Sequence, residues 1–344
     1  MTATMSRDAE QAGQGTQTLT IAKGLNLGLR AAMEADNKVI LLGEDIGRLG
    51  GVFRVTDGLQ KDFGEERVLD TPLSESGIIG AAIGLAVRGY RPVCEIQFDG
   101  FIFPGFDQII SQLAKLHYRS EGRISVPVVV RVPYGGGIGA VEHHSESPES
   151  LFCHIAGLKV VSCSNATDAY WMMQQAIASD DPVMFFEPKR RYWEKADVDT
   201  TAEPGPLMAS RLVRRGDQNT TKRATLVSYG PQMRTCLDAA TAAAEDGVSL
   251  DVIDLRSLSP LSLEPVFESV RRTGRLVMVT EAPSESSISS EVAARVQQEC
   301  FYSLEAPVHR VTGFDTPYPP AKLEEHYLPD LDRVLYAVDQ TLAY

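Results

Sequence analysis

The feature that most constrains the fold is an alternation, from Thr20 onward, of short apolar runs with longer stretches of helical pattern. Runs of β-branched residues that are apolar throughout predict strands buried on both faces, and the helical stretches between them predict crossover connections. The pattern therefore predicts an α/β fold with a mostly parallel sheet flanked by helices. Strands are expected at residues 39–42, 67–69, 92–96, 126–132, 159–161 and 182–186, and helices near 21–35, 77–87, 106–118 and 166–178.

The alternation stops and then starts again, which predicts two domains. Residues 195–222 are rich in Asp, Glu, Pro, Gly and Thr without a sustained period, as is typical of a linker. A chain of 344 residues also exceeds the usual size of one hydrophobic core. We expect domains at 19–194 and 223–344, the second with strands at 224–228, 250–254, 275–280 and 308–311 and helices near 233–245, 263–272, 290–302 and 331–342.

Composition excludes several classes of protein. The formal net charge of -13 disfavours nucleic-acid binding, which needs clustered Lys and Arg. No apolar run approaches the roughly 18 to 20 residues of a membrane helix, so no membrane association is expected. The five cysteines are odd in number and show no C-x-x-C spacing, which indicates reduced thiols. Residues 1–18 fit neither a signal nor a transit peptide; we expect a mobile tail on a cytoplasmic, bacterial protein.

Several catalytic and nucleotide-binding motifs do not occur. The sequence has no P-loop Gly-Lys-Ser/Thr, no G-x-S-x-G and no H-E-x-x-H. Residues 135–140 (GGGIGA) satisfy a relaxed G-x-G-x-x-A after a predicted strand. The context argues against a dinucleotide site, because Pro148 stands where the phosphate-binding helix should run and the next strand lacks the acid that would hold a ribose.

Three other segments carry candidate chemistry. Glu75 follows a predicted strand and opens a predicted helix, where an acid fits either a helix start or a functional carboxylate. Residues 97–107 concentrate aromatic side chains after a strand end, which suits a core plug or a ligand pocket. His143 and His144 lie in a glycine-bounded loop; a metal site with Glu142, Glu146 or His154 is one interpretation, but the spacing matches no zinc pattern, and a catalytic histidine is favoured.

Taken together, these segments resemble the beta subunits of thiamine-diphosphate-dependent 2-oxo acid dehydrogenases, a transketolase-like family. The resemblance runs in the family's order over nearly the whole chain, from Thr20 to Leu342. It rests on Leu73-Ser74-Glu75, Glu95-Ile96-Gln97-Phe98, Ile102-Phe103-Pro104 with Phe106-Asp107-Gln108, His144-Ser145 with Ser147-Pro148-Glu149, Gly157-Leu158-Lys159-Val160-Val161, Phe185-Phe186-Glu187-Pro188-Lys189 and Asp315-Thr316-Pro317-Tyr318-Pro319.

The resemblance implies a pyrimidine-binding domain at 19–194 and a transketolase-type C-terminal domain at 223–344. It implies that Glu75 hydrogen-bonds the pyrimidine ring of the cofactor and favours its imino form. Phe101 would pack on that ring, with Leu73 and Gln97 lining the same pocket.

The same resemblance assigns His144 to the cofactor's reactive carbon, where it would stabilise oxyanions or pass a proton to a lipoyl sulfur. His143 departs from the Tyr or Gln that is frequent in relatives, so the two histidines could share duties. A structural potassium site is implied at Val128, Ala176, Ser179 and Asp181, with Ser179 standing where Asp is frequent.

The chain lacks the motif that would bind the diphosphate of the cofactor, and this implies a partner subunit. This superfamily holds the diphosphate and Mg²⁺ with a Gly-Asp-Gly followed by Asn-Asn, and the chain has neither. We therefore expect both on an alpha subunit, in an alpha2beta2 heterotetramer that acylates the lipoyl arm of an acyltransferase core. The resemblance favours a branched-chain (2-oxoisovalerate) substrate, with pyruvate or acetoin as alternatives. An NAD-dependent oxidoreductase and a non-catalytic scaffold subunit are the more distant ones.

Overall fold

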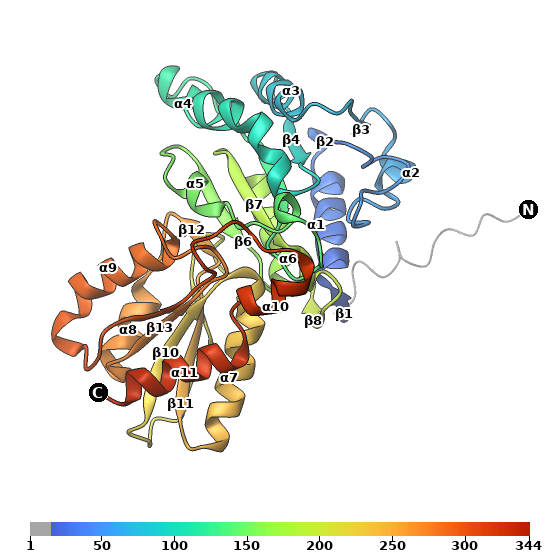
Figure 1. The fold of residues 1–344 in the computed structure, drawn as a ribbon. Helices are drawn as coiled ribbons and strands as arrows, with labels where there is room; N and C mark the ends of the chain where they lie inside the picture. Colours follow the sequence, from blue (N-terminus) through green and yellow to red (C-terminus); the bar gives the residue numbers. More distant parts are fainter. Residues whose placement is uncertain (1–14) are drawn as a thin grey trace, which may run out of the picture.

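The computed structural model describes residues 15–344, and its larger sheet has seven strands in the order β12-β6-β7-β5-β4-β2-β3. All neighbours in this sheet are parallel except β12, which pairs antiparallel with β6. Both faces are covered by helices, as the apolar runs predicted (Figure 1). The strands are β2 (Val39–Gly43), β3 (Val68–Asp70), β4 (Arg91–Glu95), β5 (Val129–Tyr134), β6 (Lys159–Ser162), β7 (Val183–Pro188) and β12 (Ser257–Ser259).

The helices of the first domain fall on two faces. On one face α1 and α6 pack against alternate residues of the sheet, and on the other face α3 and α5 do so. Side-chain caps define two of the starts, since Thr20 accepts a hydrogen bond from the Lys23 N–H and Asn165 accepts one from the Asp168 N–H. The α-helices are α1 (Ile21–Ala35), α2 (Leu59–Phe63), α3 (Glu75–Val87), α4 (Leu116–Arg119), α5 (Glu149–Cys153) and α6 (Ala166–Ala178).

The second domain is a five-stranded sheet in the order β14-β13-β10-β11-β9. Helices α8 and α9 cover one face, and α7 and α11 cover the other (Figure 1). Its strands are β9 (Arg211–Arg214), β10 (Arg223–Ser228), β11 (Ser249–Asp254), β13 (Leu276–Val279) and β14 (His309–Val311), and its helices are α7 (Met233–Glu245), α8 (Glu264–Thr273), α9 (Ile288–Cys300), α10 (Glu324–Tyr327) and α11 (Leu331–Leu342). The predicted two-domain α/β fold is confirmed.

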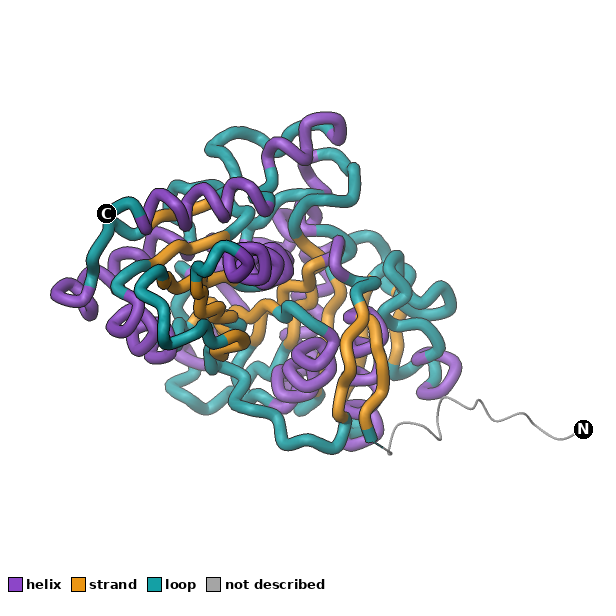
Figure 2. The backbone as a smooth tube through the Cα atoms, turned by 90° about the horizontal axis from the view of Figure 1, so that it is seen from below, coloured by secondary structure: helices purple, strands orange, loops and turns teal. Residues whose placement is uncertain are grey.

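Four short strands were not predicted, because each of them pairs with a segment distant in the sequence. The expected tail covers residues 1–18, of which residues 1–14 lie outside the described part of the chain. Residues 16–18 instead belong to the strand β1 (Thr16–Thr20). β1 pairs antiparallel with β8 (Lys195–Asp199), which lies in the expected linker; Figure 2 shows this two-stranded ribbon near the N-terminal end. β9 also lies in the expected linker, and β12 extends the first domain's sheet from the second half of the chain.

The helix expected near 106–118 is irregular. A 3₁₀ segment spans Asp99–Gly105, a π-helical turn spans Gln108–Leu113, and only Leu116–Arg119 is α-helical. Pro104 lies inside the 3₁₀ segment, where it donates no backbone hydrogen bond. Single π turns of this kind occur mostly within helices near functional sites.

The two domains share one hydrophobic core. A single cluster of buried side chains runs from Ile40 and Val130 in the first sheet to Ile253 and Met278 in the second. All five cysteines are unpaired, in keeping with the predicted thiols, and no described helix is long and apolar enough to cross a membrane.

A buried carboxyl group also joins the domains. Glu149, at the start of α5, accepts a 2.5 Å hydrogen bond from the hydroxyl of Tyr229, which in turn lies 2.9 Å from the Thr280 hydroxyl. Burial raises the pKa of Glu149 to about 7, and its second oxygen has no hydrogen-bond partner among the described residues. The neutral acid of Glu149 is therefore favoured in the folded chain below about pH 7.

We expect Glu149→Gln to change how stability depends on pH. A pKa of about 7 in the folded chain against 4.5 in the unfolded chain means that the folded state binds more protons between these values, so wild-type stability falls as pH rises through that window. Glutamine has no such proton to lose. Relative to wild type, the variant should gain about 3 kcal/mol between pH 4.5 and pH 7. Urea unfolding at several pH values measures this, with the exposed Glu268→Gln as control; parallel curves for Glu149→Gln and wild type would contradict it.

Candidate functional site

The candidate site lies where the parallel strands of the first sheet end. The carboxyl ends of parallel strands share one edge of a sheet, which is where ligands bind in such folds. The loops after β2, β3, β4 and β5 carry Glu44, Glu75, Gln97 and His144 respectively. The topology thus brings residues that are up to 100 positions apart to the same edge.

Glu75 begins α3, directly after the N-cap residue Ser74, whose hydroxyl accepts a hydrogen bond from the Gly77 N–H. The Glu75 side chain is buried, and within residues 15–344 its carboxylate accepts no hydrogen bond. Burial, followed by the negative charges of Glu75 and Asp45, raises the pKa of the neighbouring Glu44 carboxyl above its ordinary value. A carboxylate on a largely buried side chain that lacks a protein donor can accept a hydrogen bond from a ligand that brings its own N–H group.

Aromatic rings surround His144. The imidazole stacks on Phe98 with ring centroids 3.9 Å apart and an interplanar angle of 13°. Phe101 meets it edge-on at 5.0 Å. Gly100 permits this packing, because a Cβ added there would lie 2.7 Å from the Cβ of His143. The aromatic residues after β4 therefore pack against the histidine turn. The sequence alone did not show whether these aromatic residues fill the core or line a site.

The hydrogen bonding of His144 identifies its free nitrogen. Its Nδ1 lies 2.8 Å from the carbonyl oxygen of His143. A carbonyl can only accept, so Nδ1 carries the proton in this geometry and Nε2 is left to accept a proton or bind a ligand. His143 is more exposed, with 49% of its side-chain surface accessible, and its Nδ1 lies 3.4 Å from the Glu142 carboxylate.

A buried ion pair supports the same turn. Lys189, just after β7, lies 2.5 Å from Asp99, and neither side chain is exposed to solvent. The second oxygen of Asp99 accepts a 2.8 Å hydrogen bond from the N–H of Glu146. Burial raises the pKa of Asp99 and lowers that of Lys189, while the charge of each partner opposes the shift of the other. Sequence reasoning missed this pair, because its members are 90 residues apart.

Two carboxylates of the second domain reach the glycine loop that precedes the histidines. Glu281 accepts a 2.9 Å hydrogen bond from the Gly136 N–H. Glu324 accepts hydrogen bonds from the N–H groups of Gly137 and Gly139, at 2.7 and 3.0 Å. Neither carboxylate was predicted, and no local sequence signal marks them.

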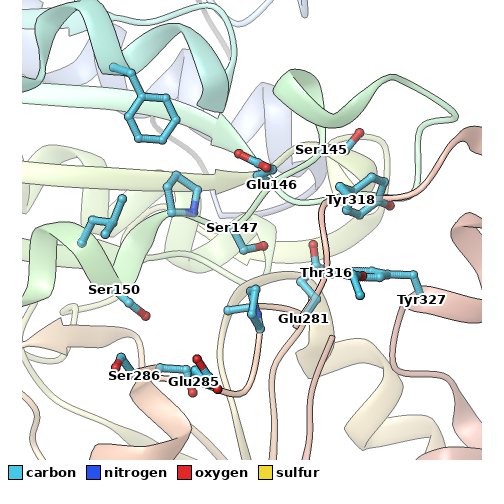
Figure 3. Close-up of a pocket in the computed structure, with 16 residues that line it drawn as sticks. Ser145, Glu146, Ser147, Ser150, Glu281, Glu285, Ser286, Thr316, Tyr318 and Tyr327 are labelled. Atoms are coloured by element: carbon cyan, nitrogen blue, oxygen red, sulfur yellow. The ribbon is translucent and has the colours of Figure 1, made fainter. Parts of the chain in front are cut away.

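A cavity of about 290 Å³ lies between the domains, beside the histidine turn. Figure 3 shows the side chains of Ser145, Glu146, Ser147 and Ser150 on one side and of Glu281, Glu285 and Ser286 on the other. Glu75, Gln97 and Phe101 do not line this cavity. Of the predicted cofactor residues, Leu73 is 81% exposed, and the Gln97 amide donates to the Glu44 carbonyl and the Asp45 carboxylate, each at 3.3 Å.

The four residues predicted to bind potassium lie around the end of α6 and the start of β7, but other groups already contact their oxygens. The carbonyl of Val128 accepts the Val183 N–H, and that of Ala176 accepts the Ser179 N–H. The Lys159 ammonium lies 3.1 Å from the Ser179 hydroxyl and 2.8 Å from the Asp181 carboxylate. This donor set is a poor fit for a metal ion, and potassium stays a prediction.

No group of three or more His, Cys, Asp or Glu side chains in the described part of the chain could hold a metal ion. The expectation that Mg²⁺ belongs to an alpha subunit stays a prediction as well.

Comparison with known protein families matches both halves of the chain. Residues 17–194 match the pyrimidine binding domain of transketolase, and residues 216–334 match the transketolase C-terminal domain. Among solved structures, a split-gene transketolase in an inactive beta4 tetramer has a TM-score of 0.78 at 21% identity, covering 94% of this chain and 98% of that one. At this identity, the likeness concerns the fold.

Curated relatives are closer in sequence. The chain is 61% identical over 328 residues to the pyruvate dehydrogenase E1 component subunit beta of Leifsonia xyli, covering 95% of this chain and 96% of the relative. It is 52% identical to the 3-methyl-2-oxobutanoate dehydrogenase subunit beta of Mycobacterium tuberculosis, over 95% and 93% of the two chains. A 2-oxoisovalerate dehydrogenase subunit beta of Bacillus subtilis is 43% identical, over 90% and 94%. With both domains matched and its sheet edge carrying the expected acid, aromatic and histidine residues, the chain belongs to the beta subunits of the thiamine-diphosphate-dependent 2-oxo acid dehydrogenases.

Proposed function

We propose that this chain forms half of an active site that decarboxylates a 2-oxo acid and transfers the acyl group to a lipoyl arm, the other half being supplied by an alpha subunit. One observation carries the proposal: the largely buried Glu75, whose carboxylate accepts no hydrogen bond from residues 15–344, lies at the same sheet edge as His144, whose Nε2 has no hydrogen-bond partner among these residues. When bound, thiamine diphosphate supplies a thiazolium carbon nucleophile activated by its own aminopyrimidine.

Glu75 is the proposed partner of the pyrimidine ring. Its carboxylate would share a proton with the ring nitrogen through a hydrogen bond. Such a hydrogen bond is strongest where water is excluded. Phe101 would pack on the ring face, with Leu73 and Gln97 at the margin. The 81% exposure of Leu73 suits a surface that a ligand or a partner chain covers in the assembled enzyme.

His144 is the proposed proton carrier. The stacking on Phe98 and the hydrogen bond from Nδ1 to the His143 carbonyl orient the ring and leave Nε2 without a hydrogen-bond partner among residues 15–344. After taking up a proton at Nε2, the ring would donate that proton to a developing oxyanion or to a lipoyl sulfur and return to its neutral form. His143, more exposed and bonded to Glu142, is the weaker candidate for this role.

We further propose a branched-chain 2-oxo acid as substrate. The segments around Gln97, Phe103 and residues 185–189 resemble branched-chain enzymes, and relatives at 52% and 43% identity carry branched-chain names. Pyruvate is the second candidate, favoured by the relative at 61% identity. Side chains of an alpha subunit would also contact the substrate, so the beta chain alone does not fix the size of the pocket.

We expect Glu75→Gln, assembled with the alpha subunit, to lower the rate of decarboxylation by roughly 100-fold or more, because an amide cannot hold the shared proton. Assembly, followed by gel filtration, should not change. Steady-state turnover with an artificial electron acceptor measures the effect. The exposed Glu66→Gln serves as control, and near-normal turnover of Glu75→Gln would exclude the assigned role.

The two histidines should differ in their contributions. His144→Ala is expected to slow acylation of a lipoyl domain by roughly 100-fold, through loss of the proton-bearing group. His143→Ala should cost less than about 3-fold, since the ring of His143 is about half exposed and packs against the His144 ring in a T-shaped contact. Single-turnover acylation followed by mass spectrometry measures both variants. Equal losses would mean that the roles are shared, and the reverse order would exchange the assignments.

Substrate class is tested by kcat/KM of the assembled enzyme for pyruvate and for 3-methyl-2-oxobutanoate. The proposal predicts a preference for the branched acid of about 10-fold or more, the scale of discrimination that a few extra buried methyl groups allow. A preference for pyruvate would overturn the branched-chain assignment and leave the family unchanged.

A further inference from the structure

The glycine loop between β5 and the histidine turn has the form of an anion-binding nest. Gly135, Gly137 and Gly139 have φ angles of 81°, 90° and 71°, in the left-handed region that favours glycine. Residues of this conformation, alternating with others along the chain, turn successive backbone N–H groups toward one side and create a concave site for an anion. In nucleotide-binding proteins that anion is a phosphate.

Here the anions come from the second domain of the same chain. The Glu324 carboxylate receives the Gly137 and Gly139 N–H groups, one on each oxygen, and Glu281 receives that of Gly136. Glu324 is buried, and its first oxygen also accepts a 2.6 Å hydrogen bond from the Tyr318 hydroxyl. The nest is therefore filled internally, which explains in physical terms why a motif that resembles a dinucleotide loop is not one.

The nest is linked mechanically to the histidine turn. The N–H of Gly135 donates a 2.9 Å hydrogen bond to the carbonyl of Glu146, so the segment between them closes into a loop with His144 inside it. The N–H of Glu146 in turn donates a 2.8 Å hydrogen bond to the Asp99 carboxylate. Moving the nest would therefore move the frame that carries His144.

We propose that Glu324 is a positioning residue: by filling the glycine nest from the second domain, it fixes the loop that presents His144. The proposal rests on the proposed role of His144, and it gives the C-terminal domain a part in the active site without direct contact with substrate. Hydrogen bonds from N–H groups to a carboxylate are stronger than those to a neutral acceptor, and this carboxylate is shielded from water.

Glu324→Gln is the sharpest perturbation, because an amide offers only one oxygen. Its NH₂ group would face a glycine N–H, so one hydrogen bond is lost and two donors are brought together in a buried place. Glu325→Gln is the matched control, since this neighbour on α10 is exposed and the substitution removes the same charge. Tyr318→Phe, which removes one hydrogen bond to Glu324, is a milder second variant should Glu324→Gln fail to fold.

The first readout is hydrogen exchange of the peptide that spans residues 134–147, measured by mass spectrometry on the enzyme assembled with its alpha subunit. In Glu324→Gln this peptide should exchange about 10-fold faster than in wild type or Glu325→Gln, while the β10 and α1 peptides keep their rates. Unchanged exchange in both Glu324→Gln and Tyr318→Phe would overturn the proposal.

The second readout is a double-mutant cycle with His144→Ala. If Glu324 acts through His144, Glu324→Gln lowers kcat for acylation about 10-fold in the wild-type background and has no further effect on the residual activity of His144→Ala. An equal loss in both backgrounds would overturn the proposal. If His144→Ala itself proves fully active, faster exchange in Glu324→Gln would still support the proposal that Glu324 fixes the loop. Only the function proposed for His144 would then fail.

Discussion

The candidate site depends on a geometrical constraint: six strands of one sheet run parallel, so their loops must converge at a common edge. That convergence gathers two acids, an amide, aromatic rings and a histidine from four separate loops. The buried pair of Asp99 and Lys189 then ties the loop after β4 to the end of β7, and through the Glu146 N–H to the histidine turn. Loss of one partner from such a pair costs about 3–5 kcal/mol, because the other charge is left buried and unpaired.

The second domain contributes directly to the structure around the candidate site. It adds β12 to the first sheet, shares one hydrophobic core with it, and supplies Tyr229, Glu281 and Glu324 to groups of the first domain. Glu281 and Glu324 bond the glycine loop that precedes the histidine turn, and Tyr229 bonds Glu149, which follows that turn. The sequence marks the two domains only by a change of pattern along the chain. In the structure the same two domains share a packed and hydrogen-bonded interface.

Local signals explain what could be predicted. The helices α1, α7 and α11 have the predicted bounds, since an apolar stripe marks each of them and a Thr or Asp cap starts two. The edge strands β8, β9 and β12 could not be predicted, because pairing with distant segments defines them. Glu75 and His144 were found through family resemblance, whereas Asp99, Lys189 and Glu324 act through contacts over 47 to 187 positions that no local pattern encodes. The glycine loop was visible in the sequence, but the carboxylates that fill it were not.

The central claim is that this chain holds only the pyrimidine half of a shared cofactor site. Isothermal titration with thiamine diphosphate and Mg²⁺ tests it most directly, on the chain alone and on its mixture with the alpha subunit. The account predicts no measurable binding by the chain alone and saturable one-to-one binding per alpha-beta pair. Tight cofactor binding accompanied by 2-oxo acid turnover in the isolated chain would contradict it.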